Sequence, residues 1–152
     1  MTRLLGVDLG DVRVGLALGD TPDGPVQPLA TIRRGPTPTA DADALRPVVE
    51  REGVEEVVLG LPLDFDGGEG HQALVTREWG AAIASALGLP VVLRDERLTS
   101  DRAARRIGPM KRGRSGGPPT STQRRAYRAR LDREAAAIIL RDEIDARSGR
   151  SR

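Results

Sequence analysis

Three acidic residues lie at points of this chain where an apolar pattern would be expected to continue. Asp8 interrupts the run LLGVDLG, which is typical of a strand buried on both faces. Glu96 directly follows a second apolar strand in VVLRDERLTS, and Asp132 opens a helix in RLDREAAAIIL. A buried carboxylate without a partner is costly, and a bound cation would relieve that cost. If the three carboxylates meet, they offer the oxygen ligands that suit Mg²⁺ or Mn²⁺, and two such ions can stabilise the attacking and the leaving oxygen of a phosphodiester.

Two of these acids also have a purely structural interpretation. Asp8 could pair with Arg13 or Arg3 beside the strand, but a buried ion pair seldom stabilises a protein more than apolar side chains would. Asp132 could simply be favoured by the helix dipole in a first turn. Its spacing to Ala136, one turn later, instead places it on the helix face toward the core. For both acids we favour the functional interpretation.

The hydrophobic pattern predicts an α/β domain in which strands and helices alternate after an initial meander. Strands are expected at 4–9, 12–18, 26–32, 57–59 and 89–93. Helices are expected up to Gly53, at 73–87, from 99 or 100 to 107, and from about 124 to 146. Asp41 or Asp43 is a candidate N-cap of the first helix, and Pro47 indicates a kink or a later start.

This order of elements is that of the ribonuclease H fold. The first three strands are joined by short turns and form an antiparallel meander, whereas the strand, helix, strand units indicate two parallel strands. We therefore expect an α/β fold with a mixed five-stranded sheet and helices on both faces. A single domain is expected over 1–146, with a flexible, basic, Gly/Pro-rich loop at 108–123 and a disordered tail at 147–152.

The composition limits the classes of function. The chain has 152 residues and only three aromatic residues, which counts against a single-strand binder built on aromatic stacking. It has no cysteine, so disulfides and thiolate metal sites are excluded. No apolar run approaches the roughly 20 residues of a membrane span. We expect a cytoplasmic protein without a membrane partner.

Basic residues gather in one part of the chain. Residues 97–133 hold twelve of them against two acids, a charge of +10, and because the whole chain carries +2 the remainder carries −8. Such a block suggests a surface for the phosphate backbone of nucleic acid, although a solvated helix face is the simpler alternative. The residues predicted to bind nucleic acid are Arg13, Arg97, Arg102, Arg105, Arg106, Lys111, Arg112, Arg114, Arg124, Arg125 and Arg128.

Four segments carry a family resemblance over nearly the whole chain. They are GVDLGDVRVGLALGD at 6–20, GLPLDFDGGEG at 60–70, DERLTS at 95–100 and LDREAAAIIL at 131–140. In this order they resemble the motifs of the YqgF-type family, whose members are similar to RuvC-like Holliday junction resolvases and are described as pre-16S rRNA nucleases. The resemblance implies that Asp8, Glu96 and Asp132 are catalytic and bind metal. It also implies a role in ribosome biogenesis or DNA processing. Asp64 and Phe65, where the family more often has Asn and Met, and the Gly/Pro-rich loop depart from the pattern, and the loop bears on substrate preference more than on chemistry.

Other polar residues near these motifs receive weaker interpretations. Asp95 and Glu96 are neighbours at a strand end and must point to opposite faces, and we choose Glu96 for the site, partly on the resemblance. Asp66 or Glu69 could hold an outer-sphere water, but a role in forming the turn is favoured for both. His71 is the only histidine and is expected at the surface.

The function expected from these observations is metal-dependent hydrolysis of a phosphodiester by an activated water, with two Mg²⁺ or Mn²⁺ ions held by the three acids. The expected partners are structured RNA or branched DNA, bound by a monomer or a homodimer. A first alternative is an ATPase of the sugar kinase and actin type, since GVDLG followed by a hairpin also opens those proteins. They need two such domains, and this chain has room for one. A second alternative is a non-catalytic RNA-binding module for ribosome assembly on the same fold.

Overall fold

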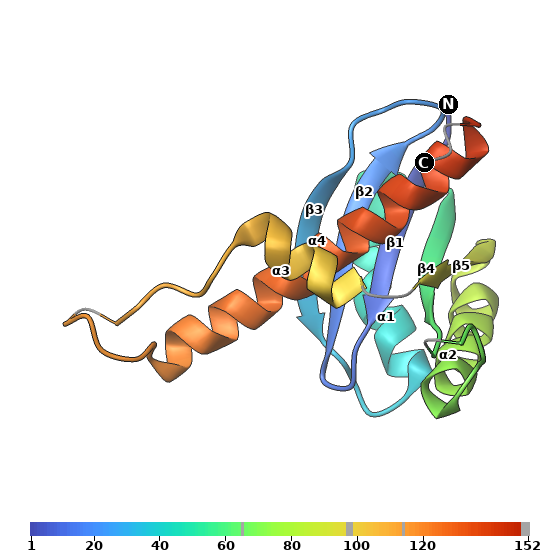
Figure 1. Ribbon diagram of the computed structural model, residues 1–152. Coiled ribbons are helices and arrows are strands. Elements are labelled where there is room, and N and C mark those ends of the chain that lie inside the picture. The colour runs from blue at the N-terminus through green and yellow to red at the C-terminus, as the bar shows by residue number, and fades with distance from the viewer. Residues whose placement is uncertain (65, 97–98, 114, 150–152) are drawn as a thin grey trace.

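The computed structural model describes residues 1–64, 66–96, 99–113 and 115–149, and it places a five-stranded sheet between two layers of helices (Figure 1). The strands are β1 (Arg3–Leu9), β2 (Arg13–Asp20), β3 (Gln27–Arg33), β4 (Glu56–Pro62) and β5 (Val91–Glu96). The helices are α1 (Pro38–Glu52), α2 (His71–Leu87), α3 (Thr99–Ile107) and α4 (Ser121–Arg147). Within the described part of the chain, no helix is long and apolar enough to cross a membrane.

The sheet has the strand order β3-β2-β1-β4-β5. β1 pairs antiparallel with β2, and β2 antiparallel with β3, so the first three strands form the expected meander. β1 pairs parallel with β4, and β4 parallel with β5, through the helical crossovers that the sequence predicts. The mixed five-stranded sheet with helices on both faces is confirmed. It brings the carboxyl ends of β1, β4 and β5 to one edge of the sheet.

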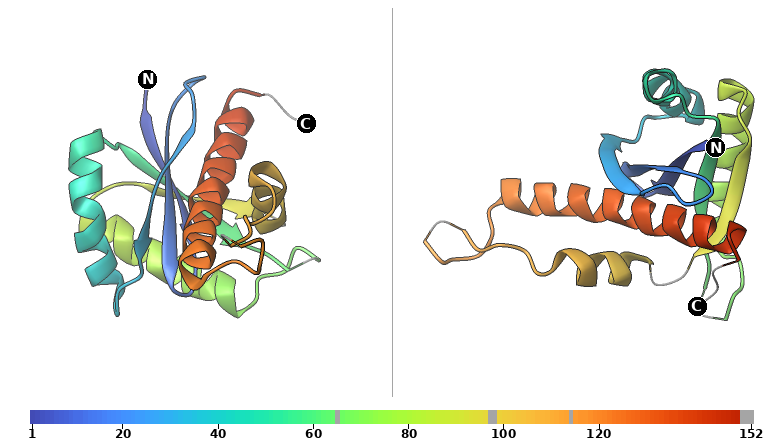
Figure 2. Two further views of the ribbon diagram at one scale, coloured as in Figure 1. Left: turned by 90° about the vertical axis from the view of Figure 1, so that its left-hand side faces the viewer. Right: turned by 90° about the horizontal axis from the view of Figure 1, so that it is seen from above.

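Strand alternation divides the core into two layers. Leu5 and Val7 of β1 face α1 and α2 and belong to the larger cluster, which surrounds the buried ring of Trp79. Leu4 faces the other way and packs with Ile139 and the rest of the apolar face of α4. Figure 2 shows α1 and α2 on one side of the sheet and α3 and α4 on the other. Every second residue of β1, including Asp8, therefore points toward α4.

Glycines let α4 lie very close to the sheet. A Cβ atom added to Gly15 of β2 would lie 2.0 Å from the carbonyl oxygen of Asp132, and one added to Gly6 of β1 would lie 2.7 Å from that of Ala136. Real Cβ contacts are longer than this, so a side chain at either position would push the helix away. The two glycines thus set the distance between α4 and the strands that carry the candidate site.

Several expected element ends are corrected by the structure. α1 begins at Pro38 behind an N-cap at Thr37, whose side chain accepts a hydrogen bond from Ala40 N, so neither Asp41 nor Asp43 caps it and its start is not delayed to Pro47. Asp41 is instead buried. Its carboxylate accepts hydrogen bonds from Gly35 N (2.6 Å) and from the indole of Trp79 (2.9 Å), which joins α1 to α2.

The second half of the chain shows two further corrections. β5 runs from Val91 to Glu96, so Glu96 is the last residue of the strand and does not follow it. α4 begins at Ser121 with a capping box between Thr120 and Gln123, and Asp132 therefore lies in the middle of the helix and does not open it.

A long projection extends from the α4 side of the sheet, and we call its residues 108–130 the arm. The amino-terminal part of α4 and the loop before it leave the body of the molecule together (Figure 1). The loop lies along the helix, because the Tyr127 hydroxyl donates to Gly108 O (2.7 Å) and the Gln123 side chain donates to Arg112 O (3.1 Å). Flexibility of this loop in the free protein stays a prediction. Of the expected disordered tail, Arg147 still belongs to α4, and residues 150–152 lie outside the described part.

Candidate active site

Asp8 is positioned by the pairing of β1 with β2. Its partner in the register is Gly15, and the missing side chain of Gly15 is what allows α4 to approach with Asp132. Asp8 shares the α4 face of the sheet with Leu4 and Gly6, which pack against that helix. It is half-buried, and no hydrogen-bond partner is found for it among the described residues. The acid predicted within the first strand is thus held beside the helix that carries the third acid.

Glu96 is positioned by the end of β5 on the same face of the sheet. It pairs in register with Pro62, and β4 lies between β5 and β1. Gly60 of β4 leaves the space between the two acids unfilled, since a Cβ atom there would lie 2.5 Å from Ile139 and 3.7 Å from the Cγ atom of Glu96. The neighbouring Asp95 points the other way and is exposed.

Asp8 and Glu96 line one hollow of about 230 Å³ on the α4 side of the sheet. Leu63 and the first turn of α3, with Thr99, Ser100 and Asp101, form its other walls. Asp101 is one of the two acids within the basic block of residues 97–133. Its place in the hollow depends on how α3 folds back over the sheet, for which the sequence offers no local signal.

Asp132 lies next to this hollow, but its carboxylate forms an ion pair with Arg13. Its Oδ2 accepts a hydrogen bond of 2.5 Å from Nε of Arg13 in β2. Among the described residues, no group of three His, Cys, Asp or Glu side chains is close enough to hold one metal ion. The structure therefore brings Asp8 and Glu96 to one hollow and leaves Asp132 beside them in an ion pair.

The electrostatics of the hollow disfavour negative charge. Burial raises the pKa of Asp8 from 3.8 to about 6, and the negative charge of Asp132 acts in the same direction. Burial likewise raises the pKa of Glu96 from 4.5 to about 7. The hydrogen bond from Thr99 lowers the pKa of Glu96, the charge of Asp142 raises it, and the charges of Arg102 and Arg94 lower it, but burial decides the direction.

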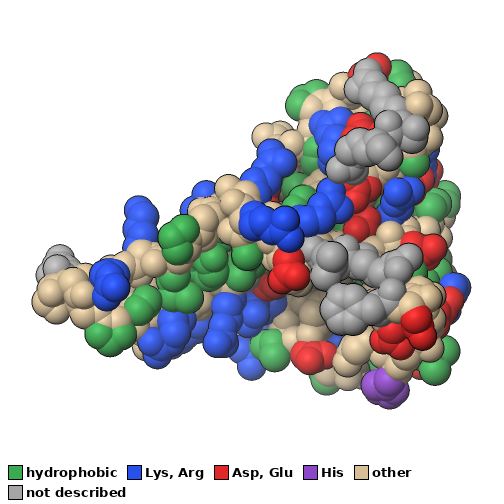
Figure 3. All heavy atoms as spheres, viewed as in Figure 1, with side chains coloured by type: hydrophobic (Ala, Val, Ile, Leu, Met, Phe, Trp, Pro, Cys, Tyr) green, Lys and Arg blue, Asp and Glu red, His purple; other side chains and the backbone are tan. Residues whose placement is uncertain are grey.

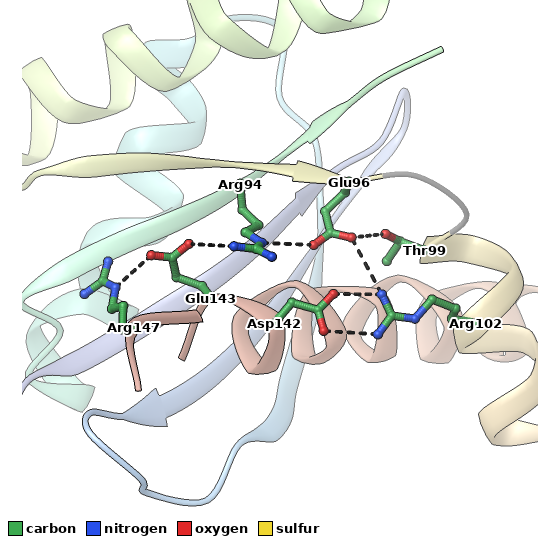
Figure 4. A network of polar contacts seen from close by, with 7 residues as sticks. All are labelled: Arg94, Glu96, Thr99, Arg102, Asp142, Glu143 and Arg147. Carbon is green, nitrogen blue, oxygen red and sulfur yellow. Dashed lines mark hydrogen bonds and ion pairs between the residues drawn. The ribbon is translucent and has the colours of Figure 1, made fainter. Parts of the chain in front are cut away.

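Glu96 belongs to a chain of alternating charges that links β5 and α3 to α4 (Figure 4). Thr99 Oγ1 donates a hydrogen bond of 2.8 Å to Oε2 of Glu96, and Arg102 lies 3.9 Å from the same oxygen. Arg102 donates two hydrogen bonds to Asp142, of 2.7 and 3.1 Å. The other oxygen, Oε1, is buried and receives no hydrogen bond from any described residue.

The donor set fits a hard divalent cation in its chemistry. Carboxylate oxygens are the ligands such ions prefer, and because burial raises the pKa values of Asp8 and Glu96, a bound cation would stabilise their charged forms. The unpaired Oε1 of Glu96 is an acceptor that a cation would satisfy. Asp132 can be a further ligand only if the hydrogen bond between its carboxylate and Arg13 is broken.

The remaining polar residues that the sequence singled out near the site have structural contacts. Asp66 accepts a hydrogen bond from Gly68 N (2.8 Å), as expected of a turn-forming residue. Glu69 is held by Arg77 through two hydrogen bonds of 2.6 and 2.7 Å. His71 is exposed at the start of α2.

The residues predicted to bind nucleic acid fall into two groups. Arg13, Arg102 and Arg106 are paired with acids of α4, the last with Glu134 at 2.7 Å. A second group is exposed on the end of α3 and along the arm, where Figure 3 shows basic side chains following the projection. This group consists of Arg105, Lys111, Arg112, Arg124, Arg125 and Arg128. Arg97 and Arg114 lie outside the described residues.

Comparison with known proteins identifies the family. A family model described as "RuvX: Holliday junction resolvase" matches residues 2–146. A protein of Anaeromyxobacter sp. (strain K) named "Putative pre-16S rRNA nuclease" is 40% identical over 146 residues, which cover 96% of this chain and 98% of the relative. A protein of the same name from Chloroflexus aurantiacus is 39% identical over 144 residues, which cover 95% and 87% of the two chains.

A solved structure supports the fold. RuvC of Thermus thermophilus, in complex with a Holliday junction substrate, matches with a TM-score of 0.54 and 16% identity over 98% of each chain. This likeness confirms the ribonuclease H-like fold that the order of elements predicts. Since the family model covers nearly the whole chain and the relatives reach about 40% identity, the protein belongs to the RuvX family, as its resemblance to the YqgF-type family had implied.

Proposed function

We propose that this protein is a divalent-metal-dependent nuclease that hydrolyses phosphodiester bonds in structured nucleic acid. The observation that carries the proposal is the hollow shared by Asp8 and Glu96, with Asp132 beside it. The hollow lies at the carboxyl ends of parallel strands, where ligands bind in open α/β sheets. The basic arm begins from α3, whose first turn forms a wall of the same hollow.

In this proposal Asp8 and Glu96 hold Mg²⁺ or Mn²⁺, and Asp132 completes the ligand set after leaving Arg13. When bound, the cation would lower the pKa of a water molecule and supply positive charge at the departing oxygen of the phosphodiester. Thr99 fixes Glu96 through its hydrogen bond to Oε2, which leaves Oε1 free to act as a ligand. Arg13, once released, is placed to interact with the phosphate next to Asp8.

The exposed basic residues of the arm would hold phosphates that flank the cleaved bond. Contacts to phosphate fix the position of the nucleic acid without reading its bases. With only three aromatic residues in the chain, recognition is expected to depend on the shape of a folded RNA or a branched DNA. The names of the relatives favour pre-16S rRNA as substrate, and the Holliday junction bound by RuvC favours branched DNA. A cytoplasmic protein would meet either one.

A nuclease assay tests the proposal. Purified protein is incubated with Mn²⁺ or Mg²⁺ and with three substrates of equal length: a folded precursor RNA, a four-way DNA junction and a linear duplex. Cleavage of the RNA or the junction that Asp8→Asn abolishes and that chelation of the metal stops is the expected result. The absence of cleavage with all three substrates and both metals would refute the nuclease.

A non-catalytic RNA-binding module for ribosome assembly is the second candidate. Two observations favour it: Asp132 is paired with Arg13, and the described residues contain no group of three acids close enough to hold one metal ion. The same assay separates the two functions. A non-catalytic module would bind structured RNA with wild-type affinity in the Asp8→Asn variant and cleave it in neither form.

A further inference from the structure

Glu96 stands between two arginines, each of which is also held by an acid of α4 (Figure 4). Arg102 Nη1 lies 3.9 Å from Oε2 of Glu96, and Arg94 Nε lies 3.8 Å from Oε1. Both distances exceed the length of a hydrogen bond. On their other sides, Arg102 donates two hydrogen bonds to Asp142, and Arg94 lies 3.7 Å from Glu143. Arg102 is therefore held by Asp142, whereas Arg94 lies at nearly the same distance from Glu143 as from Glu96.

The separation of Glu96 and Arg94 leaves two buried polar atoms without a hydrogen bond within the described part of the chain. Oε1 of Glu96 and Nε of Arg94 are both buried without a hydrogen-bond partner among the described residues, although they face each other. Buried polar atoms are normally paired, so such an arrangement requires a specific cause. On the other side, Asp142 supplies a cause for Arg102, because a carboxylate matches the planar guanidinium with two parallel hydrogen bonds.

We propose that Asp142 is a positioning residue that holds Arg102 away from Glu96 and so keeps Glu96 available to a divalent cation. The inference rests on the metal site of the proposed function. Asp142 is itself buried in α4, and its bidentate contact fixes the guanidinium at 3.9 Å from Glu96. With the charge of Asp142 removed, Arg102 would close on Glu96 to hydrogen-bond distance and compete with the cation for the same carboxylate.

The affinity of the full-length protein for Mn²⁺ tests this role without nuclease activity, and it is measured from the EPR signal of the free ion. Asp142→Asn is expected to weaken Mn²⁺ binding on the order of tenfold. A factor of this size follows from Coulomb's law if the distance between Arg102 and Glu96 shortens from 3.9 Å to hydrogen-bond length at an effective dielectric constant of about 20. The double variant Arg102→Gln/Asp142→Asn should restore the wild-type affinity, because the competing arginine is gone.

Glu134→Gln is the matched control. Glu134 is a second buried acid of α4, and its partner Arg106 lies in α3 like Arg102, at 2.7 Å. No contact joins Glu134 to Glu96 among the described residues, so Mn²⁺ affinity should not change. A loss of affinity in this variant as large as in Asp142→Asn would mean that only the docking of α3 matters, and it would overturn the inference.

Three further outcomes are decisive. Unchanged Mn²⁺ affinity in Asp142→Asn, or a loss that the double variant does not restore, overturns the inference. If Asp142→Asn does not fold, the Mn²⁺ affinity of Arg102→Gln is measured instead. Weaker binding in Arg102→Gln than in the wild type would show that Arg102 supports the site, and it would overturn the inference. If the wild type shows no Mn²⁺ binding that depends on Asp8, the proposed metal site itself fails, and the inference fails with it.

Discussion

Arg13 Nε in β2 donates a hydrogen bond of 2.5 Å to Oδ2 of Asp132 in α4. The pair joins two residues that are far apart in the sequence, and it lies beside Asp8, whose pKa is raised first by burial and then by the charge of Asp132. Arg13 thus stands where a cation would have to bind in order to recruit Asp132. The arginine neutralises Asp132 in this structure, and in the proposed metal site a cation would take its place.

This exchange predicts opposite effects of Arg13→Gln on stability and on the response to metal. The metal-free variant should lose about 1 kcal/mol of unfolding free energy, since the pair is partly exposed. Its Mn²⁺-induced rise in melting temperature should exceed that of the wild type, because Asp132 becomes available. Arg3→Gln is the control, since Arg3 and Asp20 form a similar pair of 2.8 Å between β1 and β2. Equal Mn²⁺ effects in the two variants would contradict the exchange.

A second prediction concerns the pH dependence of stability without metal. The pKa of Asp8 is raised in the folded state to about 6, so the protonated form is favoured by folding. Its contribution to stability is fully present below about pH 4 and is lost as the pH rises through 6. Asp8→Asn should therefore be more stable than the wild type at pH 7.5, by up to about 3 kcal/mol, and equally stable at pH 3.5. Urea unfolding over this pH range measures the difference in unfolding free energy between the variant and the wild type. A difference that is the same at all pH values would argue against a raised pKa of Asp8.

The part of the site that could be predicted from the sequence is the part fixed by strand periodicity. An acid among aliphatic residues in β1 stands out at once, and the alternation of β5 separates a buried Glu96 from an exposed Asp95. The two-residue period of a strand places Asp95 and Glu96 on opposite faces, and the choice of Glu96 for the site rests partly on the family resemblance. The alternation of strands with helices is equally local, and it was sufficient to predict the mixed sheet.

Interactions between distant segments leave no such local pattern. The pairing of Arg102 with Asp142 depends on α3 folding back along α4, and nothing in either segment indicates it. For Asp41 a local pattern predicts the wrong role. Its sequence neighbourhood resembles that of a helix N-cap, whereas its carboxylate accepts a hydrogen bond from the buried indole of Trp79. In each case a charged residue finds its partner only after the layers have packed.

A third prediction addresses the close approach of α4 to the sheet. Gly15→Ala would place a methyl group 2.0 Å from the carbonyl oxygen of Asp132, so the helix backbone itself must move. We expect a loss of at least about 3 kcal/mol of unfolding free energy, at the upper end of overpacking effects. Gly60→Ala meets side chains and no backbone, namely Ile139 at 2.5 Å and Cγ of Glu96 at 3.7 Å, so it should cost less, while it narrows the hollow between Asp8 and Glu96. Thermal unfolding of both variants shows which of them loses more unfolding free energy. A greater loss in Gly60→Ala than in Gly15→Ala would contradict this account of the packing.

The last prediction concerns the arm and its electrostatic role. Removing a basic side chain that binds phosphate should reduce the salt dependence of binding, with a slope change of about 0.7 to 0.9 per neutralised phosphate. Arg125→Gln/Arg128→Gln removes two exposed charges of the arm, so the slope of log affinity against log salt should fall by about 1.5 for RNA, junction and duplex alike. Arg46→Gln/Arg51→Gln removes the same charge from α1, across the sheet from α4, and should leave the slope unchanged. Limited proteolysis of the loop at 108–123 adds an independent measurement, because bound nucleic acid should slow cleavage there in the wild type and less so in the arm variant. If both double variants lower the slope equally, the arm acts only through net charge, and its role as a specific phosphate-binding surface must be abandoned.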